Sequence, residues 1–293
     1  MQTARLAGVD RIRLSLLAAL LGLAALAWLL VARRMSGMDA GPGTDPGTLA
    51  FYTLSWVVMM AAMMFPSIVP MVLVFSLVQC HGQMRGATQR SVSTNLFVAG
   101  YLITWTAAGV AAYATFVGVR SLSIGALSWS HEGRYVAGAV LLAAAGYQLT
   151  PAKNACLRRC RGPLDFVLEH WREGRLGALG MGLVHGAWCV GCCWMLMAAL
   201  FALGLMSITW MVLIAAAIAA EKLLPSPAMT NCVIAASLAA LGLAVTISPN
   251  RVPGLVLPGS ARAHHAMQAM PGMHHTTSSA PMQHSQTRRR SGA

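Results

Sequence analysis

The chain has 293 residues, of which 57% are hydrophobic and only 10% are charged. A soluble domain carries about 25% charged residues, so this composition excludes an ordinary soluble enzyme. The formal net charge of +13 does not indicate nucleic-acid binding, because the basic residues stand mostly at the ends of apolar segments and in one connecting segment. Membrane topology explains that placement. We therefore expect a lipid bilayer, and no nucleic acid, among the partners.

Apolar segments long enough to cross a bilayer recur along the chain. One crossing needs about 20 predominantly apolar residues in a helix. The sequence therefore predicts an all-α fold, a polytopic bundle of about seven transmembrane helices. The predicted spans are residues 14–32, 51–79, 96–118, 135–150, 178–205, 208–222 and 231–248. The fourth and sixth are short.

Lysine and arginine residues predict the orientation of the chain. They gather before the first span, after the second and between residues 153 and 175, which all lie on one side of the membrane. We expect a bacterial inner-membrane protein with a cytoplasmic N-terminus and a periplasmic C-terminal tail. The chain divides into an N-terminal span with an outer loop (1–50), a metal-binding membrane core (51–248) and a tail (249–293) whose polar composition predicts disorder.

The fifth predicted span contains the densest group of candidate metal ligands. His185 stands four residues after Met181 and four residues before Cys189, so the three share one face of a helix. Cys192 lies on the same face and Cys193 at its edge. Sulfur and imidazole ligands suit Cu(I) or Zn(II). Two alternatives remain: packing of small apolar thiols, and redox chemistry at the C-x-x-C of Cys189 and Cys192.

Methionines in the second predicted span form a further group of soft ligands. Met59 and Met63 are four residues apart, and neutral thioethers favour Cu(I). Pro66 and Pro70 follow and predict that the helix breaks or kinks just beyond them. The alternative is that methionine serves only as a flexible packing residue.

A basic cytoplasmic loop carries another pair of thiols. Cys156 and Cys160 are four residues apart among arginines, which would favour their thiolate forms. We predict an entrance or exit for metal there; the alternative is ordinary thiols beside arginines that bind lipid head groups. At the inner end of the sixth span, Glu221 and Lys222 are predicted to pair with each other as an anchor.

The C-terminal tail combines histidine and methionine without cysteine. Its candidate ligands are His264, His265, Met267, Met270, Met273, His274 and His275. Imidazole holds Cu(II) and thioether holds Cu(I), and the lack of cysteine fits an oxidising compartment. The methionines favour copper over nickel or zinc. Accidental low-complexity composition is the alternative.

Three motifs resemble a bacterial family of predicted metal-binding integral membrane proteins, sometimes labelled copper chaperones. They are W-x-x-M-x-x-AMM-x-PS at residues 56–67, AGYQLTP-x-K-x-ACL-x-x-CR-x-PL at 145–164, and MG-x-x-HG-x-x-C-x-GCCW-x-LM at 181–197, followed by the EKL-x-P that ends at Pro225. The resemblance implies a membrane protein that binds a metal. The first span and the tail lie outside the resembling region.

Three functions follow from these patterns, and the favoured one requires no catalytic residues, so we expect that the chain is not an enzyme. The first is capture, delivery or movement of copper, with Cu(I) favoured and zinc as the alternative metal. The second is a membrane thiol oxidoreductase that uses Cys189 and Cys192. The third is an assembly factor that serves a copper enzyme. A soluble metallochaperone or a copper enzyme would then be the partner.

Overall fold

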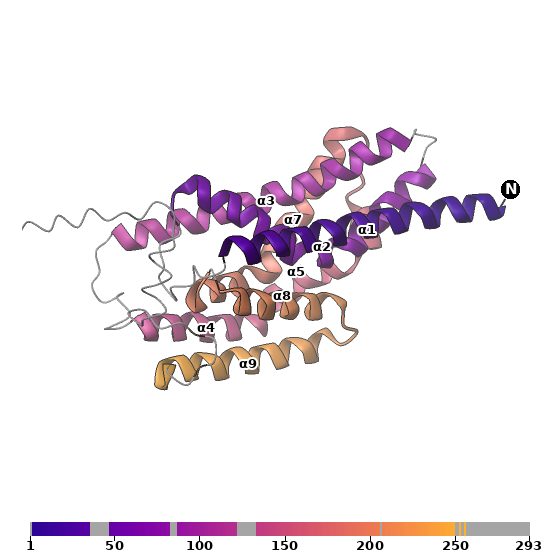
Figure 1. Ribbon diagram of the computed structural model, residues 1–293. Coiled ribbons are helices and arrows are strands. Elements are labelled where there is room, and N and C mark those ends of the chain that lie inside the picture. The colour runs from indigo at the N-terminus through magenta and orange to yellow at the C-terminus, as the bar shows by residue number, and fades with distance from the viewer. Residues whose placement is uncertain are drawn as a thin grey trace, which may run out of the picture.

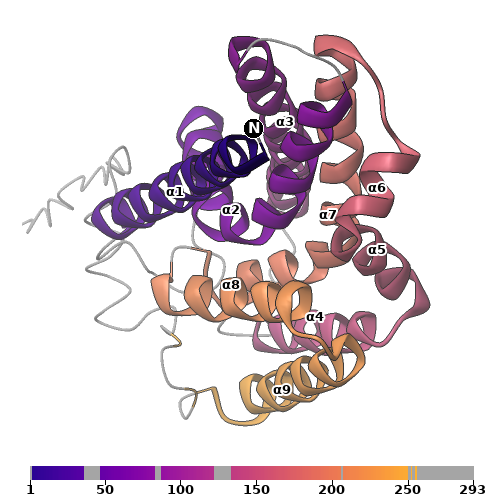
Figure 2. The same cartoon turned by 90° about the vertical axis from the view of Figure 1, so that its right-hand side faces the viewer.

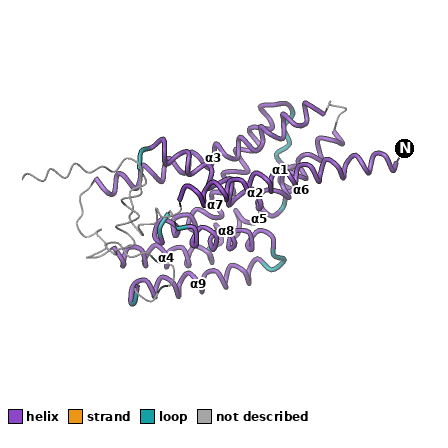
Figure 3. Tube along the Cα trace, in the orientation of Figure 1, coloured by secondary structure: helices purple, strands orange, loops and turns teal. Residues whose placement is uncertain are grey.

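The computed structural model describes residues 2–35, 47–82, 87–121, 133–205 and 207–249, with Val252 and Leu255. These residues form nine helices and no strand (Figure 3), which confirms the all-α prediction. The helices are α1 (Gln2–Met35), α2 (Leu49–Gly82), α3 (Ala87–Ser121), α4 (Arg134–Gln148), α5 (Pro151–Arg161), α6 (Pro163–Glu169), α7 (Gly174–Leu203), α8 (Ile208–Leu223) and α9 (Pro227–Ile247). The predicted histidine and methionine ligands of the tail lie outside the described residues.

Five of these helices, and not seven, are long and apolar enough to cross a bilayer: α1, α2, α3, α7 and α9. The fourth and sixth predicted spans correspond to α4 and α8, which contain 15 and 16 residues. At a rise of about 1.5 Å per residue, both are shorter than a hydrocarbon core of roughly 30 Å. The prediction of seven was wrong because apolar composition alone does not distinguish a full crossing from a helix that is too short to cross.

The helices form an elongated bundle in which most run along one common direction (Figure 1). α1 packs on α2, α2 packs on α3, and α3 packs extensively on α7. α4 pairs with α9, and α8 lies between this pair and the rest of the bundle (Figure 2). α5 packs against α7, and α6 packs mainly on α2 (Figure 2). Helix α7 therefore stands where the two groups of helices and α5 meet.

Glycines allow α3 and α7 to approach closely. A Cβ atom on Gly182 of α7 would lie 2.0 Å from the carbonyl oxygen of Phe97, and one on Gly100 of α3 would lie 2.3 Å from that of Leu179. Helices in membranes use such small residues to bring their backbones together. This contact places Tyr101 of α3 against the cysteine-rich middle of α7.

Helix α2 runs without interruption through Pro66 and Pro70. The helix therefore does not break at these prolines, and a kink there stays a prediction. Proline is tolerated inside membrane helices because neighbouring groups satisfy the freed backbone. The uninterrupted helix places Met59 and Met63, together with Ser67 in the next turn, along the same bundle interior, where all three are buried.

Large apolar side chains cover the outer faces of the peripheral helices. Leu23 and Leu26 of α1 are about half exposed, as are Val233 and Leu243 of α9. Apolar surface of this kind is rare on a protein surrounded by water. It is the surface that a helix presents to lipid, which agrees with the span lengths.

Candidate metal centre

Three thiols of α7 form a compact buried group. The Sγ atoms of Cys189, Cys192 and Cys193 lie within 4.8 Å of one another, and all three residues are buried. Spacings of three and four residues bring side chains together on one helix. The thiols of Cys192 and Cys193 both donate to the carbonyl oxygen of Cys189, at 3.1 and 2.9 Å. Because a metal–sulfur bond is about 2.3 Å long, small side-chain rotations are enough to bring the three sulfurs onto one ion.

Helix α5 brings a fourth thiol to this group. The Sγ atom of Cys160 lies 3.8 Å from that of Cys192. The segment predicted as a cytoplasmic loop is helical, and Thr150 caps the start of α5 by accepting a hydrogen bond from the backbone N–H of Lys153 at 3.2 Å. In the sequence, Cys189 lies about 18 Å of helix away from the inner end of its predicted span, which would keep it far from the thiols of the connecting segment. In the structure α5 packs against α7, so its thiols reach the middle of α7.

Cys156 lies against α7 one turn before Cys160. A Cβ atom on Gly191 would come within 2.8 Å of the Cys156 Sγ atom, so the missing side chain makes room for this thiol. Burial raises the pKa of the half-buried Cys156 thiol, with a further contribution from nearby Cys192. The expectation that neighbouring arginines favour its thiolate was therefore wrong. Arg159, for example, pairs with Glu169 instead.

Two polar groups from other helices contact Cys189. The Nζ atom of Lys222, on α8, lies 3.0 Å from the Cys189 Sγ atom and donates to the Ser67 hydroxyl at 3.2 Å. The hydroxyl group of Tyr101 lies 3.1 Å from the same sulfur. The sequence interpretation missed both contacts. The available signal was an ionisable residue within an apolar segment, which usually has a function.

The predicted pairing of Glu221 with Lys222 was wrong. Glu221 instead forms a buried ion pair with Lys153 of α5, with an N–O distance of 2.8 Å. Arg161, at the end of α5, donates to the carbonyl oxygen of Leu224 at 2.6 Å. The two contacts fasten both ends of α5 to the end of α8, so that they position Cys160 and Lys222 around α7.

His185 stands apart from the thiol group, although the sequence predicted it as a ligand beside Cys189. Its buried ring lies 6.0 Å from the ring of Phe97, 5.8 Å from that of Tyr101 and 5.2 Å from that of Phe166, measured between centroids. Among the described residues, nothing forms a hydrogen bond with its Nδ1 atom. Met181, one turn earlier, is also buried. The residues predicted to share one ligand-bearing face of the helix therefore lie in two different environments: His185 is among aromatic rings, and the cysteines form the thiol group.

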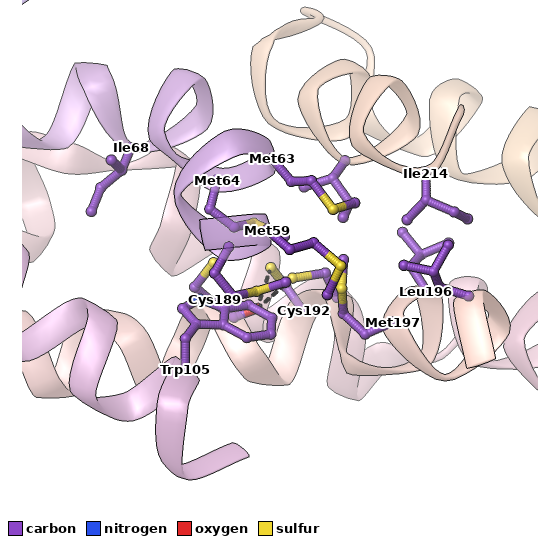
Figure 4. Close-up of a cluster of buried hydrophobic side chains, with 14 of the residues drawn as sticks. Met59, Met63, Met64, Ile68, Trp105, Cys189, Cys192, Leu196, Met197 and Ile214 are labelled. Atoms are coloured by element: carbon purple, nitrogen blue, oxygen red, sulfur yellow. Dashed lines mark hydrogen bonds between the residues drawn. The ribbon is translucent and has the colours of Figure 1, made fainter. Parts of the chain in front are cut away.

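Methionines of α2 face the thiol group across the bundle. Met59 and Met64 lie beside the part of α7 that carries Cys189 and Cys192, whereas Met63 extends toward the side of Ile214 (Figure 4). All three methionines are buried. The structure thus brings together thioethers and thiols that are more than a hundred residues apart in the sequence. Neutral thioether sulfur beside thiol sulfur is an environment that suits a soft ion.

The fold and the site define a helical protein with five potential membrane spans and a buried, thiol-rich candidate metal centre. The chain belongs to the copper chaperone family PpoB2, which matches residues 53–245. The match confirms the resemblance seen in the sequence motifs. It covers every thiol and thioether of the centre and leaves out the tail. No curated protein and no solved structure matches the chain.

Proposed function

We propose that this chain is an inner-membrane protein that binds Cu(I) as cargo and captures, delivers or moves it. The ion binds within the four-thiol group, defined as Cys160, Cys189, Cys192 and Cys193. One observation carries the proposal: four thiols from two helices converge at one place inside the bundle. A single cysteine in a helix core is commonly a packing residue, but packing does not explain four thiols beside a lysine.

The surroundings of the four-thiol group favour Cu(I) over Zn(II). Four thiols alone would also suit Zn(II), which commonly takes four ligands in a tetrahedron, so the neighbouring side chains distinguish the two metals. Thioethers, which carry no charge, favour Cu(I), and the buried side chains of Met59 and Met64 lie beside Cys189 and Cys192 (Figure 4). The Lys222 ammonium group beside Cys189 offsets one thiolate charge, which reduces the cost of burying a charged site. Zinc is the alternative cargo.

Metal content and Cu(I) affinity of the detergent-purified protein test the proposal. The samples are the wild type, a chain truncated after Ser248, and the triple variant C189S/C192S/C193S. We expect the truncated chain to retain copper and the triple variant to lose it. The control is Cys232→Ser, which removes an exposed thiol of α9 and leaves binding unchanged. Because the tail carries candidate ligands of its own, the triple variant is also made in the truncated chain, and retention of copper by that combination would contradict the proposal.

A thiol oxidoreductase is the second candidate, because Cys160 and Cys192 approach each other to 3.8 Å. Two thiols at this separation are well placed to form a disulfide and to pass two electrons to a membrane quinone or a partner disulfide. The reactive pair would then be Cys160 with Cys192, and not Cys189 with Cys192 as the sequence predicted. A thiol count that changes neither with a quinone nor with a disulfide oxidant would exclude this function, whereas copper binding would survive.

Delivery to a copper enzyme is a particular form of the first proposal. The thiol group is the same, and only the acceptor differs. A knockout that lacks activity of a copper-dependent oxidase, with recovery on addition of copper, would support delivery. Normal oxidase activity in the knockout, together with altered copper tolerance, would favour capture or movement of the ion.

A further inference from the structure

The thiols around α7 differ in their access to the surroundings. Cys189, Cys192 and Cys193 are at most 1% exposed. Cys160 and Cys156, both on α5, are half-buried. Cys160 joins the two sets: its sulfur atom lies 3.8 Å from that of Cys192, and it also interacts with Cys189. The thiols therefore form a series that runs from the three buried thiols of α7, through Cys160, to Cys156 on α5.

We propose that Cys160 is the transfer ligand that passes the ion between the three α7 thiols and the α5 surface. The inference rests on the proposed function, because it requires the four-thiol group to bind Cu(I). The three α7 thiols belong to one rigid helix and are sufficient to hold an ion. Cys160 belongs to a separate short helix, approaches the Cys192 sulfur to 3.8 Å, also interacts with Cys189, and remains partly accessible.

Transfer proceeds by ligand exchange and involves no change in the oxidation state of copper. A Cu–S bond forms with Cys160 while the ion is still bound on α7, and the bond to Cys192 then breaks. The remaining bonds to α7 thiols break as the ion goes on to Cys156 and to the ligands of the acceptor. Each incoming thiol gives its proton to the α7 thiolate that it replaces, and a thiolate displaced by a neutral acceptor ligand takes a proton from water. Cys156 lies one turn away along α5, against Gly191. It is the next thiol on the way from the bundle interior to the α5 surface.

Release kinetics test this inference. The wild type and Cys160→Ser are loaded with one equivalent of Cu(I) in detergent and mixed with bathocuproine disulfonate, a water-soluble Cu(I) chelator whose complex absorbs visible light. We expect Cys160→Ser to keep one bound ion and to release it at least tenfold more slowly. Cys160→Met restores a soft ligand and is expected to recover much of the rate. Cys232→Ser, which removes a thiol elsewhere, should release at the wild-type rate.

The alternative outcomes overturn the inference in different ways. Loss of the ion from Cys160→Ser would make Cys160 a permanent ligand of the holding site. Unchanged or faster release would show that the ion leaves by another route. In both cases the wild type still binds copper and the proposed function stands. A wild type that binds no Cu(I) would instead refute the proposed function and the transfer role together.

Discussion

Lys222 places its Nζ atom 3.0 Å from the Sγ atom of Cys189, although the two residues belong to different helices. An ammonium group at this distance stabilises negative charge on sulfur. Hydrogen bonds to charged groups contribute about 1.5–3 kcal/mol, and about 1.4 kcal/mol corresponds to a tenfold change in affinity. We therefore expect Lys222→Met to weaken Cu(I) binding about tenfold or more, as measured by competition with a chelator of known affinity.

Arg158→Met is the matched control for Lys222→Met, because it removes a cation from the exposed surface of α5. It should leave the Cu(I) affinity unchanged. Lys222→Arg keeps the positive charge and should retain part of the affinity. Equal affinities for Lys222→Met and Arg158→Met would show that the contact with Cys189 does not contribute to metal binding.

The buried pair of Lys153 and Glu221 predicts a large stability effect. Both side chains are 1% exposed, and removal of one partner from a buried ion pair costs about 3–5 kcal/mol. Glu221→Gln should lower the free energy of unfolding in detergent by this amount. In contrast, Glu169→Gln breaks the exposed pair with Arg159, and exposed pairs contribute at most about 1 kcal/mol.

A double variant checks that the stability loss comes from an uncompensated charge. Lys153→Met combined with Glu221→Met removes both charges, so its free energy of unfolding should be closer to the wild type than that of Glu221→Gln alone. A double variant as unstable as the single one would mean that the contact positions α5 through its geometry and not through its charge.

The close contact between α3 and α7 predicts opposite results for two alanine substitutions in the same helix. A Cβ atom on Gly182 would lie 2.0 Å from the Phe97 carbonyl oxygen, whereas one on Gly180 would meet nothing within 4 Å. We expect Gly182→Ala to lower the unfolding midpoint by forcing the helices apart. Gly180→Ala should leave it unchanged or raise it, because alanine favours helix more than glycine does. Equal midpoints would contradict the close approach of these two helices at Gly182.

Oxidation of the metal-free protein predicts one particular disulfide. Diamide accepts two electrons and two protons from a pair of thiols, which then form a disulfide. Because the sulfur atoms of Cys160 and Cys192 are 3.8 Å apart, we expect them to cross-link, as identified by mass spectrometry of alkylated peptides. Bound Cu(I) should protect the pair. Cross-links that involve Cys232, or no protection by copper, would contradict the arrangement around α7.

Sequence patterns predicted the features that depend on local chemistry. Apolar segments predicted the helical class, and the spacing of Cys189, Cys192 and Cys193 placed these thiols together on one helix. A helix has a fixed pitch, so residues three and four apart are neighbours wherever the helix lies. Three motifs also indicated the family, which its match to residues 53–245 confirms.

Only the tertiary structure decided which distant residues meet. Cys160 lies next to Cys192, Lys222 contacts the sulfur of Cys189, and Glu221 forms an ion pair with Lys153. The structure also shows that His185 packs among aromatic rings, and that five of the described helices, in place of the seven predicted, are long enough to span a membrane. These outcomes depend on how helices pack, and packing is set by surfaces that lie far apart in the chain. Periodicity and composition describe one segment at a time, so they contain no information about the helix on the other side of the contact.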